Sequence, residues 1–493
     1  MTRRRRTPRP APLPSDFAAR MRELLGEDEA AALLAALARP PARGVRVQPG
    51  RATLDELSAR TGWPLRTLPW TDRAAVLEAD DVAPGRHPLH EAGAFYVQDP
   101  AATAPAVALA VQPGAWAIDL AAAPGGKATA LAGDLAGQGV LVANDAGGQR
   151  LAALARNLER VGARNAVVTG APPGDLARRW AGRFDAVLLD APCSGEGMFR
   201  KSEAARRAWS RRAVAACAIR QDDLLDAAAD LLAPGGRLVY ATCTFAPEEN
   251  EGAVARLLTR REELRPAPLR LPGTDPGRPD WAARANALPA EACARLWPHR
   301  HPGDGHFLAS LVREGGTDGH APRGRGEGTA GAPAGPAAVT AWRRFAGAAL
   351  AGDAVPEARR EGALREAGGV LWAAPPAPDA GGLTVLRPGL ALGRAHGDGR
   401  FEPAHALAQA LRPDEARARI DLDPDGPSVL RYLAGEELGL GADEPRDVRA
   451  LGVDASAAEL AVLVSVAGVP VGWGQRRGTR LRNRYPKGLR RRR

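Results

Sequence analysis

Short runs of apolar residues alternate with longer amphipathic segments through the middle of the chain. Such alternation is typical of βαβ units, in which helices cover a parallel sheet. The pattern predicts strands at residues 115–120, 140–144, 166–169, 184–190 and 237–242. It predicts helices at residues 126–136, 149–161, 203–232 and 248–261, and a last apolar run at residues 306–312 is expected to close the sheet. Residues 96–313 are therefore predicted to form a doubly wound α/β domain.

The flanking regions follow other patterns. Residues 1–95 are predicted to form a small α+β domain, with helices at residues 16–38 and 53–61, the second beginning at a Thr53 cap. Residues 314–340 are rich in Gly, Pro, Ala and Thr without an apolar period, which predicts a flexible linker. Residues 341–493 are predicted to form a separate α+β module. No internal repeat is found.

Composition narrows the class of protein. The four cysteines in 493 residues form no CxxC pair and no zinc spacing, so we expect a reducing, cytoplasmic setting and no metal. The apolar run at residues 30–38 is too short to span a bilayer, so neither membrane insertion nor secretion is expected. The net charge is +10, yet the first ten residues hold five arginines and the last twenty hold ten basic residues, without an acid in either. These basic ends predict a polyanionic partner, although such tails also serve solubility alone.

One turn of the predicted sheet has the features of a nucleoside-binding site. The segment Ala121-Ala122-Ala123-Pro124-Gly125-Gly126-Lys127 leaves a strand and enters a helix, and Asp145 follows Gly125 by 20 residues, the spacing of a ribose-binding carboxylate. Ala121 and Ala128 stand where a phosphate-binding P-loop needs glycine and a hydroxyl, and no GxGxxG occurs. An adenosine cofactor without phosphates, S-adenosylmethionine, suits this turn best. The alternative is a purely structural connection.

Reactive side chains follow two other strands. Asp190 ends one predicted strand and Cys193 follows it, while Cys243 follows the next strand. Carbon 5 of cytosine accepts a methyl group only after a thiolate adds to carbon 6, and a thiolate requires nearby positive charge or hydrogen bonds. Lys127, one of only three lysines against 64 arginines, is a candidate for that charge, as are the hydroxyls of Thr242 and Thr244 for the hydrogen bonds. Asp190 is a candidate to contact ring nitrogen 3, but spacing does not decide which cysteine is the nucleophile.

The chain resembles the Sun-type family of RNA cytosine-5 methyltransferases, in particular its bacterial ribosomal-RNA branch with a C-terminal extension. The residues that carry the resemblance are Ala121 to Lys127, Asn144-Asp145, Asp190-Ala191-Pro192-Cys193-Ser194-Gly195, Thr242-Cys243-Thr244, the segment Gly195 to Lys201, and Gly472-Trp473-Gly474. The resemblance implies a Rossmann-like S-adenosylmethionine-dependent domain between an N-terminal RNA-binding domain and a PUA-like RNA-binding module.

The resemblance also implies roles for individual residues. Cys243 would be the nucleophile and Cys193 would assist product release. Residues 121–127, Asp145 and Asp190 would line the S-adenosylmethionine pocket. The implied substrate is 16S ribosomal RNA or the 30S subunit, methylated on cytosine carbon 5 by a cytoplasmic enzyme that we expect to be monomeric.

Four features depart from the family pattern. Ala121 replaces the usual Cys or Asp-like residue, and Asp145 replaces the more usual Glu. Pro172 stands where relatives often carry an acid that contacts adenine, with Asp175 as the nearest substitute. The segment Arg46-Val47-Gln48 stands where relatives tend to have Arg-x-Asn.

Two other functions remain open from the sequence. A catalytically silent RNA-binding assembly factor would keep the fold and the basic tail, although the intact Cys243 and Lys127 argue against it. A methyltransferase acting on 23S ribosomal RNA or transfer RNA would share every catalytic residue. The particular cytosine is beyond what any motif indicates.

Overall fold

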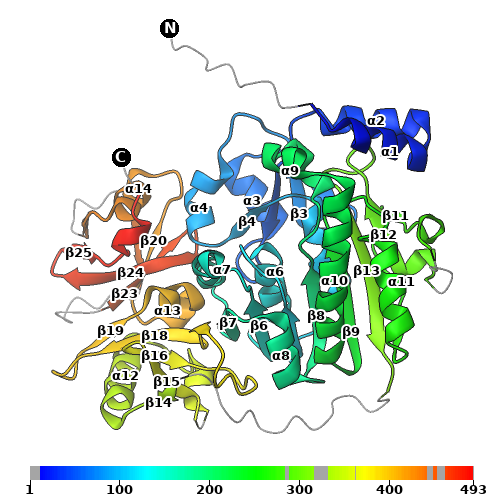
Figure 1. Cartoon of the computed structure of the whole chain (residues 1–493). Helices are drawn as coiled ribbons and strands as arrows, with labels where there is room; N and C mark the ends of the chain where they lie inside the picture. The colour runs from blue at the N-terminus through cyan, green and yellow to red at the C-terminus, as the bar shows by residue number, and fades with distance from the viewer. Residues whose placement is uncertain are drawn as a thin grey trace.

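The part of the chain that the structure describes contains four β-sheets (Figure 1). The structure is a computed structural model that describes residues 12–283, 288–315, 331–360, 362–440, 448–451 and 461–491. The five arginines of the first ten residues, Arg492 and Arg493 of the tail, and residues 316–330 of the predicted linker lie outside these ranges. Within them, no helix is long and apolar enough to cross a bilayer.

The N-terminal region combines a helical hairpin with a four-stranded sheet of order β2-β3-β1-β4. Its elements are α1 (Ser15–Leu25), α2 (Glu27–Leu37), β1 (Gly44–Val47), α3 (Leu54–Thr61), β2 (Leu65–Leu68), β3 (Thr71–Leu77), α4 (Pro88–Glu91) and β4 (Phe95–Gln98). The helix predicted at residues 16–38 is two helices, because Gly26 adopts a left-handed φ of 82° between them. Thr53 caps α3 as predicted: its hydroxyl accepts from the Glu56 amide, and Glu56 accepts from the Thr53 amide. The predicted boundary after residue 95 is wrong, since it cuts β4, which pairs with β1.

The central sheet confirms the predicted α/β class. Its parallel strands are β5 (Trp116–Asp119), β6 (Val140–Asn144), β7 (Ala166–Thr169), β8 (Phe184–Asp190) and β9 (Leu232–Thr242), in the order β9-β8-β5-β6-β7. As predicted, residues 306–312 join the sheet: β13 (His306–Arg313) pairs antiparallel with β9, although it is not the last strand. Beyond it the sheet continues through three short strands: β10 (Leu264–Pro266), β11 (Asp275–Pro276) and β12 (Cys293–Leu296).

Helices cover both faces of this sheet, which explains why its strands read as continuous apolar runs. One face packs against α8 (Pro173–Trp180), α10 (Arg211–Leu231) and α11 (Glu251–Arg260). The other packs against α5 (Ala104–Leu109), α6 (Gly126–Asp134) and α7 (Gly148–Arg160). The single helix predicted at residues 203–232 is instead α9 (Glu203–Ala208) and α10, because Ser210 caps the second helix by accepting from the Ala213 amide.

The C-terminal region contains two sheets rather than one module. The first has the order β14-β15-β16-β18-β19, and the second has the order β21-β25-β24-β23-β20-β22. Elements of the first part are β14 (Ala332–Pro333), α12 (Pro336–Ala349), β15 (Leu364–Ala367), β16 (Val370–Ala373), β18 (Leu390–Ala395), β19 (Phe401–Pro403) and α13 (His405–Ala410). Elements of the second are β20 (Arg419–Leu422), α14 (Pro427–Ala434), β21 (Leu438–Gly439), β22 (Val448–Leu451), β23 (Ala461–Val466), β24 (Val469–Arg477) and β25 (Arg480–Asn483). Since β14 and the start of α12 fall inside the predicted linker 314–340, that prediction is wrong for its last residues.

A strand from the C-terminal region extends the catalytic sheet. β17 (Val385–Arg387) pairs antiparallel with β7, and the Gly170 amide donates to the Thr384 carbonyl at 2.9 Å. Arg387 is buried and donates to the Ala163 carbonyl. In Figure 1 the C-terminal region, yellow to red, accordingly lies at the β7 side of the sheet. This strand was not predicted, because three residues are too few to show an apolar period.

Candidate active site

The carboxyl edge of the parallel strands gathers the predicted site residues. Asp119 ends β5, Asp145 follows β6, Asp190 ends β8 and Cys243 follows β9. The parallel register aligns β5 with both β6 and β8, so these groups share one edge of the sheet. Ligands bind at this edge in doubly wound folds.

Asn144 fixes the loops that line this edge. Its side-chain amide donates to the Leu120 carbonyl at 3.1 Å and the Ala171 carbonyl at 3.0 Å. Its Oδ1 accepts from the Thr169 hydroxyl at 2.9 Å and the Ala171 amide at 3.0 Å. This buried amide therefore joins the turn after β5 to the loop after β7, which bears Pro172.

The turn at residues 121–127 is anchored to Asp145. The Ala123 amide donates to Asp145 Oδ2 at 3.2 Å, and the Gly147 amide donates to Asp145 Oδ1 at 2.9 Å. Gly125 adopts φ 116° directly before α6, which a residue with a Cβ rarely does. Asp145 is almost fully buried, whereas its ion-pair partner Arg150 is 61% exposed, so this partner can move aside for a ligand.

Asp119 was not singled out in the sequence, yet it is the most unusual acid of the edge. It is fully buried, and neither carboxylate oxygen has a hydrogen-bond partner within the described residues. Burial raises the pKa of Asp119 to about 7, although Lys127 opposes the shift. A buried acid without a partner favours a cationic or hydroxyl-bearing ligand beside it.

Lys127 and Asp190 form an ion pair with Nζ and Oδ2 2.6 Å apart. Burial disfavours the Lys127 ammonium, but Asp190 outweighs it and the pKa of Lys127 is raised. Lys127 therefore carries a positive charge, and Cys243 lies within reach of that charge. The role of Lys127 beside a thiolate stays a prediction.

The two predicted cysteines are in contact. Their Sγ atoms lie 3.3 Å apart, and the Cys243 amide also approaches Cys193 Sγ at 3.4 Å. The hydrogen bond to Cys243, together with burial, raises the pKa of Cys193 well above its ordinary value. Either sulfur can be the donor of this contact, and the raised pKa of Cys193 is a feature that spacing in the sequence did not show.

Two buried glutamates hold the cysteine loops together. Glu249 accepts from the amide and hydroxyl of Ser194, next to Cys193, and from the Thr244 hydroxyl, next to Cys243. Glu196 likewise accepts from the Phe245 amide at 2.9 Å. Burial raises the pKa of Glu249 to about 7. Neither glutamate was predicted as a site residue, since nothing in the sequence separates Glu249 from the neighbouring surface acid Glu248.

We expect Glu249→Gln to lower kcat by about 100-fold with little change in the affinity for cofactor. The glutamine NH₂ group would face hydrogen-bond donors that now converge on a carboxylate, so the cysteine loops would shift. Displacing a reactive group by about 1 Å lowers a rate by about 100-fold. Steady-state methyl transfer and cofactor titration measure the two effects. Glu248→Gln is the matched control, because Glu248 is half-exposed and pairs with Arg20. An unchanged kcat in Glu249→Gln would exclude the positioning role.

The second lysine of the site region, Lys201, also pairs with acids. Its Nζ lies 2.6 Å from Asp304 Oδ2 and 3.0 Å from Asp99 Oδ2. His306 follows at the start of β13, and its buried Nδ1 has no hydrogen-bond partner among the described residues. Burial, reinforced by Lys127, lowers the pKa of His306, so its ring is neutral. These residues were missed because they meet only in the folded chain.

The chain matches family models along most of its length. Residues 106–312 match the model described as 16S rRNA methyltransferase RsmB/F, and residues 13–100 match the N-terminal domain of 16S rRNA methyltransferase RsmF. Residues 348–411 match the RsmF first C-terminal domain, and residues 419–491 match the RsmF PUA domain. Ribosomal RNA small subunit methyltransferase F of Klebsiella pneumoniae is 31% identical over 468 residues, covering 92% of each chain. The chain belongs to the RsmF family of 16S rRNA methyltransferases.

Other comparisons agree with this RsmF assignment. Ribosomal RNA small subunit methyltransferase F of Escherichia coli is 31% identical over 97% of this chain and 96% of its own. A crystal structure of a methyltransferase homologue from Pyrococcus horikoshii is 29% identical, with a TM-score of 0.55 over 60% of this chain and 94% of its own. The structure of NSun6 from the same organism with SFG shares the fold at 21% identity, with a TM-score of 0.54 over 62% of this chain and 99% of its own.

Membership of the RsmF family confirms the family resemblance and S-adenosylmethionine as the cofactor. The residues present fit this molecule, which carries two cationic groups and a ribose diol but no phosphate. The edge offers buried carboxylates, including Asp119, which has no hydrogen-bond partner among the described residues. We expect Asp145 to hold the ribose hydroxyls, and Asp119 and Asp190 to face the charged methionine part. When bound, the cofactor supplies the methyl group.

We expect Asp145→Asn to raise the Kd for S-adenosylmethionine about tenfold or more. Hydrogen bonds to a charged group contribute about 1.5–3 kcal/mol each, and the variant also loses an anchor of the Ala123 amide. Isothermal titration measures the Kd. Asp223→Asn is the control, because Asp223 is exposed on α10, which covers the face of the sheet opposite α6. Equal Kd values for both variants would contradict the ribose assignment.

Proposed function

We propose that this protein methylates carbon 5 of cytosine in 16S ribosomal RNA through a covalent bond between Cys243 and cytosine carbon 6. One observation carries the proposal: two cysteine sulfurs in contact at 3.3 Å, next to a charged Lys127. Methyl transfer to a nitrogen or oxygen nucleophile needs neither thiol. The family supports ribosomal RNA as the substrate class.

The raised pKa of Cys193 supports the roles that we propose for the pair. Because the raised pKa of Cys193 keeps its proton in place, its thiol donates a hydrogen bond that favours the thiolate of Cys243. The Lys127 ammonium stabilises the same negative charge. Cys243 Sγ then adds to carbon 6, and negative charge develops at ring nitrogen 3. Asp190, 29% exposed beside Lys127, takes a proton from solvent and donates it to that nitrogen, which offsets the charge.

Release of the product requires the second sulfur. Once Cys243 Sγ is bonded to carbon 6, the largest cause of the raised pKa of Cys193 is gone. Burial still opposes the thiolate, but Cys193 then releases its proton to solvent more readily than before. The Cys193 thiolate then takes the proton from carbon 5. The electrons of that C–H bond form the carbon 5–carbon 6 double bond, and the carbon 6–sulfur bond breaks toward Cys243 Sγ.

The test identifies both the RNA and the atom that is methylated. Purified enzyme and methyl-labelled S-adenosylmethionine are incubated with unmodified 30S subunits, 16S RNA, 23S RNA and transfer RNA, and each RNA is digested to nucleosides. The proposal predicts labelled 5-methylcytidine from 16S RNA, naked or in the 30S subunit. Label found only in 23S RNA or transfer RNA would show that 16S RNA is not the substrate. RNA binding without any label would favour the catalytically silent assembly factor. An enzyme of this kind acts in the cytoplasm, and its monomeric state stays a prediction.

A further inference from the structure

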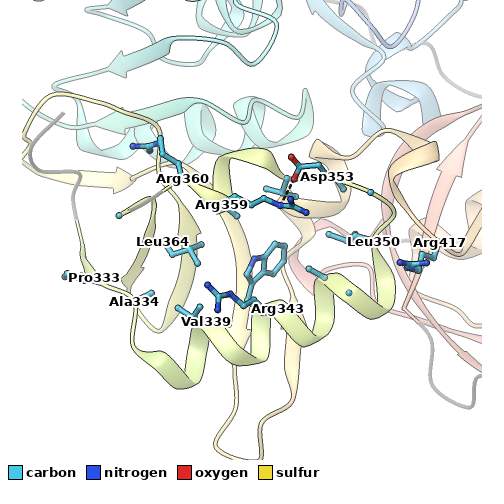
Figure 2. A pocket seen from close by; sticks show the side chains of 18 residues that line it. Pro333, Ala334, Val339, Arg343, Leu350, Asp353, Arg359, Arg360, Leu364 and Arg417 are labelled. Carbon is cyan, nitrogen blue, oxygen red and sulfur yellow. Dashed lines mark ion pairs between the residues drawn. The ribbon is translucent and has the colours of Figure 1, made fainter. Parts of the chain in front are cut away.

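A hollow of about 640 Å³ opens in the first C-terminal domain, away from the cysteine pair. Figure 2 shows Arg343 extending from α12, with Arg359 and Asp353 across the hollow from it and Arg417 at one end. The apolar part of the wall is formed by Val339, Trp342, Leu350, Val355 and Leu364. We call this site the arginine hollow; its size is that of sites that enclose a small organic group.

The charge of the arginine hollow is strongly one-sided. Its lining contains four arginines, Arg343, Arg359, Arg360 and Arg417, and a single acid, Asp353. Asp353 pairs with Arg359 at 2.8 Å. Arg343 and Arg417 are exposed and form no ion pair with any described residue. Two cations are thus available to an anion, in a chain whose positive excess otherwise resides in its two ends.

The combination of cations and an apolar wall favours a ligand that has both an anionic group and an apolar face. A phosphate alone would need only the arginines, and a duplex would present phosphates but keep its bases paired and stacked. An unpaired nucleotide presents both a phosphate and an exposed apolar base face. We propose that the arginine hollow binds one unpaired nucleotide of the substrate RNA, with the phosphates that flank the nucleotide at Arg343 and Arg417 and its base against the apolar wall.

The proposal rests on the proposed function in one respect, that RNA is the substrate. The arginine-hollow proposal goes beyond the proposed function, because the hollow lies outside the PUA domain matched at residues 419–491. β17 couples this region directly to the catalytic sheet. An RNA strand held in the arginine hollow is therefore held at a fixed position relative to the cysteine pair.

The test uses a hollow double variant, Arg343→Gln/Arg417→Gln. Its controls are the single variant Arg344→Gln and the charge-matched double variant Arg344→Gln/Arg412→Gln. Arg344 and Arg412 are exposed arginines from the same region that do not line the hollow. We expect the hollow double variant to raise the Kd for a single-stranded 16S RNA fragment about tenfold and to lower the salt slope of binding by about 2. The Kd for a duplex of the same sequence should change less than twofold. For methyl transfer, KM should rise with kcat unchanged.

The outcomes separate this proposal from the proposed function. Equal losses in the hollow double variant and the charge-matched control double variant, or equal losses on single-stranded and duplex RNA, would overturn the arginine hollow as a nucleotide site. A wild-type enzyme that produces no 5-methylcytidine, while the hollow double variant still loses single-strand affinity selectively, would overturn the proposed chemistry and leave the hollow intact.

Discussion

Cys243→Ala is expected to lower methyl transfer by about four orders of magnitude or more. Without the sulfur, carbon 5 of the cytosine is not activated, and neither Lys127 nor Asp190 replaces a covalent bond to carbon 6. The variant should fold normally, since the cysteine is only half-buried and its loop is held by Glu249 and Glu196. Single-turnover transfer from labelled S-adenosylmethionine to 16S RNA measures the loss.

The control for this variant is Cys217→Ala. Cys217 lies on α10, partly exposed and apart from the cysteine pair, so its removal should leave the rate within twofold. The Kd for cofactor should be unchanged in both variants, because the cofactor edge does not use either thiol. Full activity in Cys243→Ala would eliminate the covalent mechanism.

Cys193→Ala is expected to trap the enzyme on its product RNA. The variant retains Cys243, so addition and methyl transfer proceed, but the proton on carbon 5 has lost its acceptor and the carbon–sulfur bond persists. We expect a protein–RNA band that survives denaturing electrophoresis and is absent or faint in the wild type. Turnover should fall to about one methyl group per enzyme.

The doubly substituted Cys193→Ala/Cys243→Ala enzyme is the control for trapping, and it should yield no such band. If Cys243→Ala trapped the RNA and Cys193→Ala were merely inactive, the roles of the two sulfurs would be reversed. That outcome would also contradict the inference from the raised pKa of Cys193.

The sequence predicted the catalytic sheet well because a parallel sheet covered on both faces leaves a strong mark. Each of its strands is a buried apolar run between helical segments, and the polar residues that end the runs, Asp190 among them, lie at the functional edge. The sequence did not predict two points where a long helix is divided into two, each of which has a local cause. The Ser210 cap divides α9 from α10, and Gly26 divides α1 from α2, although the apolar period continues across both.

The rest of the site depends on contacts between distant segments. Glu249 joins two loops that are 50 residues apart, and Asp99 meets Lys201 across about 100 residues. Nothing local distinguishes these acids from exposed ones. Asp119 was missed for a different reason: its unusual property is the lack of a partner within the described residues, which only the folded environment reveals.

The covalent mechanism is tested most directly by trapping the wild-type enzyme on 16S RNA that contains 5-fluorocytidine. Fluorine at carbon 5 cannot leave as a proton does, so an enzyme that adds a sulfur to carbon 6 and transfers a methyl group remains attached. Mass spectrometry of the digested complex then identifies the attached residue. The account predicts a methylated 5-fluorocytidine bonded to Cys243. Attachment to Cys193, or labelled 5-methylcytidine from ordinary 16S RNA without any trapped complex on the fluorinated RNA, would contradict it.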